Sequence, residues 1–460
     1  MFAATRNDDF AENLYGHFVN PQWVRLLDVL QMNVSYVRCS GVELQTADGR
    51  VILDFNAGYG VHNVGHNHPR IIAAIKDELD KIGPAMLQSH VPDLAGKLAA
   101  RLCALAGGRL SKVFFGSSGS EGIEAAIKFA RGYTGRTGIL CGSGGFHGLT
   151  CGALSLMSNP FWQEGFGALL PDTAFIPYGD SEELERKLAT KAFAALVLEP
   201  IQGEGGVLVP PQEYLATAQA LCRRYHTLFV LDEVQTGLFR TGPFLAAHHF
   251  GVEPDMVILA KALSGGLVPS SAVLMSDPVY EAVYSSLKRA LIHTSTFSEN
   301  SLAMRAGLAT LDVLQDEGLG RRATTAGETL RSALTERLAT YEMIREIRGV
   351  GLLNAIEFQA PRSFKNRIAF EAFAKIHPAL FGQIVVMRLF RDHGILSQVC
   401  GNDFMVLKVS PPLTVNDAQL YHFVSAVEQV VAGVRKAVGI RRGAISDNMK
   451  VSFQAARSIG

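Results

Sequence analysis

The chain has 460 residues, of which 48% are hydrophobic and 19% charged, so its composition is that of a globular protein with two or three domains and not of a disordered segment. Lysine plus arginine and aspartate plus glutamate each number 43, which leaves no net charge to attract a nucleic acid or an anionic membrane. A small molecule is therefore the expected partner.

Cysteine spacing and the start of the chain give no sign of export. The six cysteines include no Cys-x-x-Cys pair and are expected to be reduced thiols. No apolar run is long enough to cross a bilayer, and the first nine residues lack the charged and apolar regions of a secretory signal. His66 and His68 lie on a turn without a nearby third ligand, so no metal is expected. We expect a cytoplasmic protein.

Residues 1–54 are expected to form an N-terminal arm and part of a smaller domain, with a tight hairpin turn at Asp48-Gly49. Over residues 55–324, short β-rich apolar runs alternate with helical stretches or loops. Such alternation predicts an α/β fold, in which a largely parallel sheet is covered by helices on both faces. The runs begin at Val113, Gly138, Ala174, Ala195, Leu228, Met256 and Ser271.

A segment of small residues, Gly116–Glu121, follows the first of these runs and precedes a helical stretch. Backbone amides and the positive end of the helix dipole would favour a phosphate there. Clusters of serine and glycine are also common as plain helix caps. The segment alone leaves both interpretations open.

Two charged residues close later apolar runs. Asp232 follows Leu228–Leu231, and Lys261 follows Val257–Ala260. A lysine forms a Schiff base only when its amine is neutral, which burial near other cations favours, and a carboxylate beside a pyridine nitrogen keeps that nitrogen protonated. The pair suits pyridoxal phosphate, although a single lysine at a strand end is more often an ordinary exposed residue.

A helical stretch near residues 301–314 leads to residues 325–440, which are expected to form a smaller α+β domain. This segment holds a strand over residues 351–358 and a last helix near residues 416–437. Residues 441–460 are polar and basic and are expected to form a loosely held tail.

Six further segments stand out along the chain: Ser118–Arg131, Phe146–Gly148, Leu198–Gly206, Leu231–Gly237, Ala260–Ala262 and His293–Phe297. They resemble, in order, the landmarks of the class III pyridoxal-phosphate aminotransferases, and the likeness runs from about Gly41 to Val430. The chain looks most like the putrescine, ornithine and acetylornithine aminotransferases. The resemblance implies fold type I: a large domain, residues 55–324, with a mostly parallel seven-stranded sheet flanked by helices, and a smaller α+β domain from the chain ends. It also implies pyridoxal 5'-phosphate as cofactor and a homodimer with shared active sites.

The resemblance assigns the chemistry to particular residues. Lys261 would bind the cofactor covalently and shuttle the proton, while Asp232 would pair with the pyridinium nitrogen. Phe146, beside His147, would stack on the cofactor ring, and Gln235 would approach its phenolic oxygen. Packing in the core is the alternative for an isolated phenylalanine.

The resemblance also assigns the phosphate and one entrance position. Ser118, Gly119 and Ser120 would hold the phosphate, and Thr296 would reach it from the neighbouring subunit. Tyr59 matches a loop position that lines the substrate entrance. Loop aromatics are also frequent packing residues.

Two positions depart from the family pattern. Where the ornithine-like members have an arginine that grips the substrate α-carboxylate, this chain has Leu149, which makes an α-amino acid donor less expected. Before the Pro-Pro-Leu segment the family usually has an arginine that holds the oxo acid, gated by a glutamate. Here Glu204 is kept but the arginine is replaced by Lys408, which binds a carboxylate as a point charge and not as a planar fork.

The apolar stretch within residues 361–391 allows two interpretations. An amphipathic helix packed on the smaller domain is favoured, because helical apolar stripes usually bury in cores. The alternative is a wall for a longer apolar substrate.

The expected function is transfer of an amino group from a primary terminal amine, with a putrescine-like diamine favoured, to a 2-oxo acid such as 2-oxoglutarate or pyruvate. The alternatives are a biosynthetic transaminase that aminates an aldehyde or ketone on a larger apolar scaffold, an ornithine- or acetylornithine-type aminotransferase, and an aminomutase. A regulatory protein that binds the cofactor without turnover ranks last, because Lys261 and Asp232 are both present.

Overall fold

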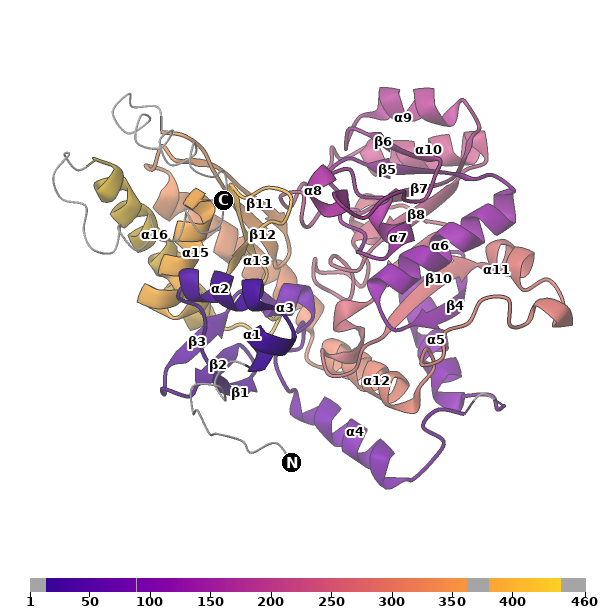
Figure 1. Cartoon of the computed structure of the whole chain (residues 1–460), viewed down its shortest axis with the longest axis horizontal. Coiled ribbons are helices and arrows are strands. Elements are labelled where there is room, and N and C mark those ends of the chain that lie inside the picture. The colour runs from indigo at the N-terminus through magenta and orange to yellow at the C-terminus, as the bar shows by residue number, and fades with distance from the viewer. Residues whose placement is uncertain (1–13, 88, 362–379, 440–460) are drawn as a thin grey trace, which may run out of the picture.

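The computed structural model describes residues 14–87, 89–361 and 380–439. A seven-stranded sheet with its helices lies on one side of the molecule, and two four-stranded sheets with the helices α13, α15 and α16 lie on the other (Figure 1). Within these described residues, no helix combines the length and apolarity that a bilayer crossing requires.

The large sheet confirms the predicted mostly parallel α/β architecture. Its order is β4-β10-β9-β8-β7-β5-β6. β10 is antiparallel to both β4 and β9, and the remaining four pairs are parallel. Each predicted apolar run supplies one strand, with bounds β4 Leu110–Gly116, β5 Gly138–Gly142, β6 Thr173–Ile176, β7 Phe193–Leu198, β8 Leu228–Asp232, β9 Met256–Leu259 and β10 Ser271–Ser276.

Helices cover both faces of this sheet because successive strand side chains point to opposite sides. Val230 packs in one cluster with Ile123 of α6 (Gly119–Thr134). Leu231 packs in another cluster with Leu98 of α5 (Asp93–Ala106) and Leu221 of α10 (Tyr214–Tyr225). Each such buried aliphatic side chain contributes about 1.5–3 kcal/mol. Gly122 lets α6 approach closely, since a Cβ there would lie 2.6 Å from Ile258 Cγ2.

The strand directions bring the carboxyl ends of six of the seven strands to one edge of the sheet, and β6 is among them because it is parallel to β5. The carboxyl ends of β5, β7, β8 and β9 share this edge because these strands are parallel, and β4 points the same way because β10 is antiparallel to both β4 and β9. The antiparallel β10 therefore begins at this edge. Ligands of open α/β sheets bind at such carboxyl edges.

The N-terminal strands form a second sheet with a strand from far along the chain. β1 (Tyr36–Ser40), β2 (Glu43–Thr46) and β3 (Val51–Asp54) pair in antiparallel order, and β3 pairs in parallel with β13 (Ile395–Leu396). Gly49, at φ 84°, lies in the predicted turn between β2 and β3.

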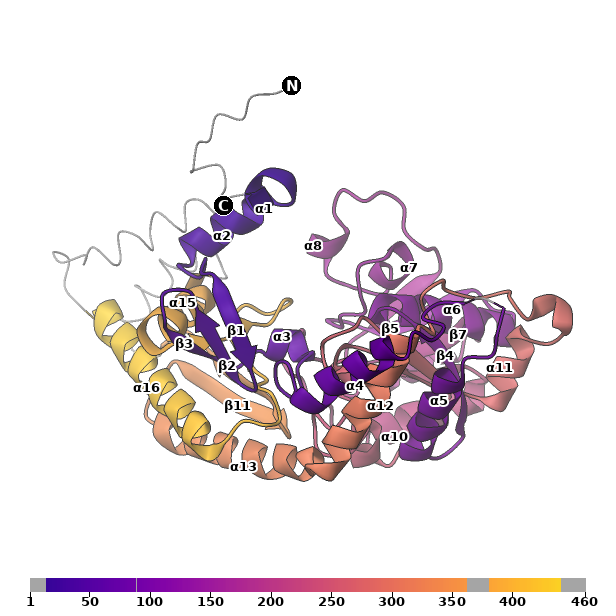
Figure 2. The same cartoon turned by 90° about the horizontal axis from the view of Figure 1, so that it is seen from below.

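The third sheet, β11-β12-β15-β14, packs on long helices. Figure 2 shows α13 along the edge of this unit, following α12 of the other unit. The part of the stretch 361–391 that the structure describes supports the packing interpretation, because Phe381, Val385, Val386 and Met387 of α15 are buried. Residues 362–379 lie outside the described chain. The bounds are β11 Ile344–Val350, β12 Leu353–Phe358, β14 Gln398–Val399, β15 Val406–Val409, α12 Ser301–Asp316, α13 Leu319–Leu338, α15 Leu380–His393 and α16 Asp417–Gly439.

A buried arginine joins the two sides. Arg240 is 1% exposed and donates to Leu352 O at 3.1 Å, to Pro411 O at 2.5 Å and to Asn63 Oδ1 at 2.6 Å. Burial lowers its pKa to about 9. The remaining helices are α1 Leu14–Phe18, α2 Pro21–Val29, α3 Ala57–Gly60, α4 Pro69–Asp80, α7 Cys151–Leu154, α8 Pro160–Gln163, α9 Ser181–Leu188 and α11 Asp277–Val283, with short 3-10 helices η2 Ala246–Phe250, η3 Lys261–Ser264 and η4 Leu287–Arg289.

Candidate active site

A cavity of about 480 Å³ lies at the carboxyl edge of the large sheet. It is lined by loops that follow β4, β5, β7, β8 and β9 and by the segment before β10. Eight residues predicted to bind the cofactor line it together: Ser118, Gly119, Ser120, Phe146, His147, Asp232, Gln235 and Lys261.

Asp232, the last residue of β8, forms a buried pair with His147. His147 Nδ1 lies 2.8 Å from Asp232 Oδ2, and each residue is 4% exposed. Burial alone would lower the pKa of His147, but the hydrogen bond and charge of Asp232 and the charge of Glu199 outweigh it and raise that pKa. The carboxylate is therefore held in one orientation at the base of the cavity.

Lys261 follows β9 and begins η3 in the left-handed region, at φ 45°. Only glycine adopts this region without strain, so the surrounding packing holds the backbone there. Burial and the nearby charge of Lys408 lower the pKa of Lys261 to about 8, although the carboxylates of Glu204, Asp232 and Glu199 act in the opposite direction. About a tenth of the amine is therefore neutral at pH 7, far more than for a lysine with the ordinary pKa.

The start of α6 supplies a concave backbone surface. Ser118 caps this helix, and its Oγ accepts a hydrogen bond from Glu121 N at 3.2 Å. Gly148, at φ 118°, passes so close that a Cβ there would lie 2.1 Å from Ser120 Oγ. Free backbone amides and the dipole of a helix start together bind phosphate groups.

Glu199 was not predicted as a site residue, although it lies in one of the quoted motifs. Its Oε1 accepts from Phe146 N and its Oε2 from Gly203 N, each at 2.9 Å. Burial raises its pKa to about 7, a shift that His147 opposes and Asp232 reinforces. Its position directly after β7 was the available signal, because polar strand ends at this edge face ligands.

Three further residues form a second cluster beside the cavity, together with Gln235 of the cavity wall. Lys408, 1% exposed, contacts Glu204 Oε1, and Gln235 Nε2 donates to the same oxygen at 3.1 Å. Burial would raise the pKa of Glu204, but the charge and hydrogen bond of Lys408 lower it to about 2. The ring centroid of Tyr59 lies 5.8 Å from Lys408 Nζ. Through Gln235, this cluster continues the cavity wall.

Two predicted residues belong to neither the cavity lining nor the second cluster. Leu149 follows the cavity residue Gly148 and is 55% exposed. Thr296 is exposed on the loop before α12, where its neighbour Ser295 donates to Glu121 Oε1 at 3.4 Å. Among the residues that the structure describes, no group of three or more His, Cys, Asp or Glu could hold a metal.

Comparison with known proteins identifies the family. The pattern of the family described as "Aminotransferase class-III" matches residues 27–431. The chain belongs to the class III aminotransferases. It is therefore an enzyme that uses pyridoxal 5'-phosphate, as the resemblance of its six sequence segments implied.

Several relatives are similar over most of this class III chain. A Serratia sp. protein named aminotransferase PigE is 37% identical over 447 residues, which cover 90% of this chain and 52% of the relative. A putrescine aminotransferase from Pectobacterium atrosepticum is 38% identical over 404 residues, which cover 86% of this chain and 81% of the relative. A Toxoplasma gondii ornithine aminotransferase structure, with partial occupancy of PLP at its active site, matches at 30% identity with a TM-score of 0.80, covering 95% of this chain and 100% of that chain. The chain spans only about half the length of the Serratia protein.

The cavity residues of this aminotransferase fit the cofactor. Asp232 offers an anion to a ring cation, Lys261 an amine of lowered pKa, and the α6 start a phosphate cradle. Ser270 Oγ, at the cavity wall, is buried without a hydrogen-bond partner among the described residues, so the site has unused polar capacity. A Cβ on Gly119 would lie 3.2 Å from Val234 Cγ2, so only a bare backbone leaves this space open.

Proposed function

We propose that this aminotransferase moves the amino group of a primary terminal amine without an α-carboxylate to a 2-oxo acid. The observation that carries the proposal is the apolar, 55% exposed Leu149 beside the cavity residue Gly148. A leucine side chain has no hydrogen-bond donor, so it cannot replace the two parallel hydrogen bonds by which an arginine binds a carboxylate. An amine without a carboxylate at this position needs no such hydrogen bonds, so the leucine does not weaken its binding.

Lys261 and Asp232 would carry the chemistry. When bound, the cofactor supplies the electron sink for a carbanion next to the transferred nitrogen. Lys261 would hold the cofactor aldehyde and, after substrate displaces it, move a proton between substrate and cofactor carbons with Nζ. Asp232, oriented by His147, would keep the ring nitrogen protonated. The lowered pKa of Lys261 supports its role as a nucleophile and base.

Phe146 and Gln235 would contact the cofactor ring, and Gly119 and Ser120 would donate to its phosphate. Their common position on the cavity wall supports this assignment. His147 would act through Asp232, and Ser118 would cap the helix whose first amides bind the phosphate.

Thr296 would complete the phosphate site of a partner subunit in a homodimer. It lies outside the cavity of its own chain, in a region with prominent apolar exposure. Leu287 is 97% exposed and Leu291 is 80% exposed on the segment between α11 and α12, and Ile82, just after α4, is 92% exposed. Exposed apolar residues concentrated in this way are typical of a protein interface.

Lys408 and Glu204 would select the acceptor. In their contact Glu204 neutralises Lys408, so an incoming carboxylate would have to displace Glu204 to reach the ammonium group. A 2-oxo acid such as 2-oxoglutarate or pyruvate could do this, and Tyr59 would border the same space. The lysine would bind this acid with weaker geometric selection than an arginine.

A putrescine-like diamine is the first candidate donor, in line with the name of the Pectobacterium relative. A longer apolar amine or carbonyl compound is the second. Two exposed aromatic residues on the segment that follows α7 favour it, because Phe161 is 67% exposed and Phe166 is 70% exposed. Leu149 argues against ornithine-type donors, and an aminomutase would consume amine without forming an amino acid from the oxo acid.

Two measurements test the proposal. Borohydride treatment of the holoenzyme followed by peptide mapping is expected to label Lys261; a label elsewhere would overturn the assignment. Loss of the cofactor's aldehyde-form absorption should then be followed as diamines, ornithine analogues and long-chain amines are added singly. Reaction with ornithine alone would contradict the proposed donor class, and reaction confined to long-chain amines would select the second candidate.

A further inference from the structure

Asn402 lies on the loop between β14 and β15 and uses its side chain to tie this loop to the large sheet. Its Oδ1 accepts hydrogen bonds from Trp162 Nε1 at 2.8 Å and Asn159 Nδ2 at 3.0 Å. Its Nδ2 donates to Gly144 O at 2.9 Å. One amide side chain therefore connects the loop before Phe146 with the α8 segment.

Both connections lead to Phe146. The Trp162 ring packs edge-on against the Phe146 ring, with centroids 5.4 Å apart and planes at 84°. Gly144 lies two residues before Phe146, and its amide donates to Ser158 Oγ at 2.9 Å. The ring of Phe146 is thus constrained by an aromatic neighbour and its backbone by a hydrogen-bonded turn, and Asn402 contacts both constraints.

The backbone of the same loop reaches the Glu204–Lys408 cluster. Gly401 N donates to Glu204 Oε2 at 2.8 Å, and Asn402 N donates to Glu204 O at 3.0 Å. A Cβ on Gly401 would lie 3.2 Å from Glu204 Oε2 and 3.5 Å from Trp162 Cζ2. The loop therefore lies between the proposed acceptor site at Glu204 and the aromatic pair of Phe146 and Trp162.

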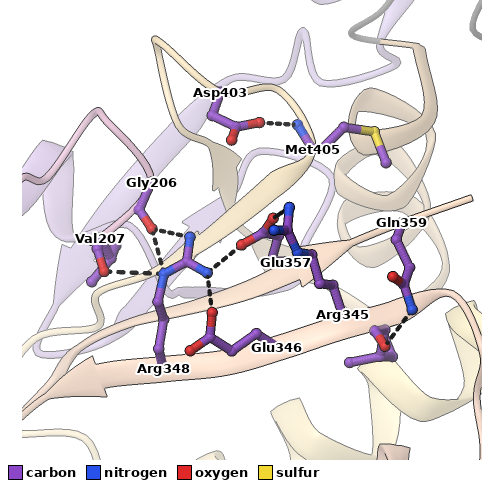
Figure 3. A network of polar contacts seen from close by, with 10 residues as sticks. Gly206, Val207, Arg345, Glu346, Arg348, Glu357, Gln359, Asp403 and Met405 are labelled. Atoms are coloured by element: carbon purple, nitrogen blue, oxygen red, sulfur yellow. Dashed lines mark hydrogen bonds and ion pairs between the residues drawn. The ribbon is translucent and has the colours of Figure 1, made fainter. Parts of the chain in front are cut away.

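Polar contacts around the loop limit its movement (Figure 3). Asp403 Oδ1 accepts from Met405 N at 3.0 Å, which closes the turn before β15. Arg348 of β11 donates to Gly206 O at 2.6 Å and to Val207 O at 3.2 Å, and its guanidinium also contacts Glu357. These contacts hold β11 and β12 against the segment after β7 that carries Glu204.

We propose that Asn402 is a positioning residue for amino transfer: through Trp162 and Gly144 it sets the Phe146 ring against the cofactor cavity. The inference rests on the proposed contact of Phe146 with the cofactor ring. Asn402 is not proposed as a catalytic residue, because it lies outside the lining of the cofactor cavity. Its effect on the rate follows from the placement of the ring, since small displacements of reacting groups reduce turnover strongly.

Three substitutions separate the parts of this arrangement. Trp162→Phe keeps an aromatic ring beside Phe146 but removes the Nε1–H donor, and Asn402→Leu removes all side-chain hydrogen bonds at similar volume. Asn402→Asp keeps the acceptor for Trp162 and replaces the donor to Gly144. Asn416→Ala is the control. Asn416 caps the start of α16, where its Oδ1 accepts from Gln419 N at 2.9 Å, and it takes no part in the contacts with Trp162 and Gly144.

The first readout needs neither cofactor nor activity. The chain has two tryptophans, Trp23 and Trp162, so a Trp23→Phe background leaves Trp162 as the only tryptophan emitter. In cofactor-free protein, Asn402→Leu is expected to shift the Trp162 emission and increase its quenching by iodide. An unchanged emission would overturn the inference, because it would mean that Asn402 does not hold Trp162.

The second readout uses the holoenzyme. We expect Asn402→Leu to change the circular dichroism of the bound cofactor and to lower kcat of both half-reactions between about 10- and 100-fold, with little change in either KM. Trp162→Phe and Asn402→Asp should have smaller effects, and Asn416→Ala none. Altered Trp162 emission with unchanged cofactor dichroism would overturn the positioning role. Failure of the proposed donor class would not affect either spectroscopic readout.

Discussion

His147 Nδ1 lies 2.8 Å from Asp232 Oδ2 in a nearly solvent-free environment at the base of the cavity. Replacing this histidine leaves a buried carboxylate without its ring donor. Because a hydrogen bond to a charged group contributes about 1.5–3 kcal/mol, His147→Leu should weaken cofactor binding by roughly 10- to 100-fold. Titration of cofactor-free protein with pyridoxal phosphate measures this, and the exposed His422→Leu variant is the control. Equal affinities would show that Asp232 needs no orienting partner.

Incorporation of the cofactor should accelerate as pH rises through about 8. The pKa of Lys261 is lowered to about 8 by burial and by Lys408, and only the neutral amine attacks an aldehyde. Removing the cation at Lys408 removes a cause of this lowering, so Lys408→Met should move the midpoint to higher pH. The rate of cofactor binding to cofactor-free protein, measured from pH 6 to 10, tests this. A midpoint that stays the same in Lys408→Met, as in the exposed control Lys97→Met, would contradict the electrostatic coupling.

Breaking the Glu204–Lys408 contact should destabilise the protein. Lys408→Met leaves a buried carboxylate without a counter-ion, a change that costs about 3–5 kcal/mol, whereas Lys408→Met with Glu204→Gln should recover much of this loss. Urea unfolding at neutral pH compares the two. If the double variant were no more stable than Lys408→Met, an unpaired charge would not be the cause.

The same contact predicts a dependence of stability on pH. The pKa of Glu204 falls from an ordinary 4.5 to about 2, so the folded state favours the carboxylate. This contribution is fully present above about pH 4.5 and is lost as pH falls towards 2. The difference in unfolding free energy between the natural chain and Glu204→Gln should therefore be constant near neutrality and shrink in acid. A difference that grows in acid would reverse the sign of the argument.

Leu149→Arg should change donor preference. A guanidinium beside Gly148 would offer a bidentate partner for an α-carboxylate, so kcat/KM for α-amino acids with a distal amine should rise relative to that for diamines. The ratio of the two values, measured with one acceptor, checks this. Leu149→Met keeps the apolar surface and should leave the ratio unchanged. No gain in the arginine variant would mean that Leu149 does not face the donor.

Gly148→Ala should damage the phosphate cradle. Gly148 adopts φ 118°, and a Cβ there would lie 2.1 Å from Ser120 Oγ, so the start of α6 or the loop has to move. We expect cofactor affinity to fall at least as strongly as in His147→Leu. Gly96→Ala in α5 is the control, because a Cβ there meets nothing within 4 Å and the substitution should stabilise the helix by about 0.5–1 kcal/mol. Unchanged affinity in Gly148→Ala would place the phosphate elsewhere.

The strands of the large sheet could be predicted from sequence because each is a short apolar run that burial on both faces requires. The order and direction in which the strands pair could not be predicted. β10 inserts between β4 and β9 in antiparallel direction, and β13 pairs with β3 across more than half of the chain, through backbone contacts that leave no local pattern.

Some residues of the candidate site could likewise be predicted from sequence, and others could not. Lys261 and Asp232 could be predicted because each ends an apolar strand, and the structure brings both to one cavity. Asn402 and Trp162 could not be predicted, since Asn402 lies in an ordinary loop and Trp162 in a short helix, and each gains its importance only from a partner distant in sequence. The roles of Thr296 and Leu149 stay predictions, because they concern a partner chain and a substrate.

The buried guanidinium of Arg240 has a consequence for protein engineering. Its three acceptors belong to Asn63, Leu352 and Pro411, which are distributed over nearly the whole length of the chain. Hybrids that exchange the C-terminal part with a related enzyme will have to transplant this junction as a set. A crossover that displaces the main-chain carbonyls of Leu352 and Pro411, or that removes the Asn63 amide, would leave a charge where water cannot reach it.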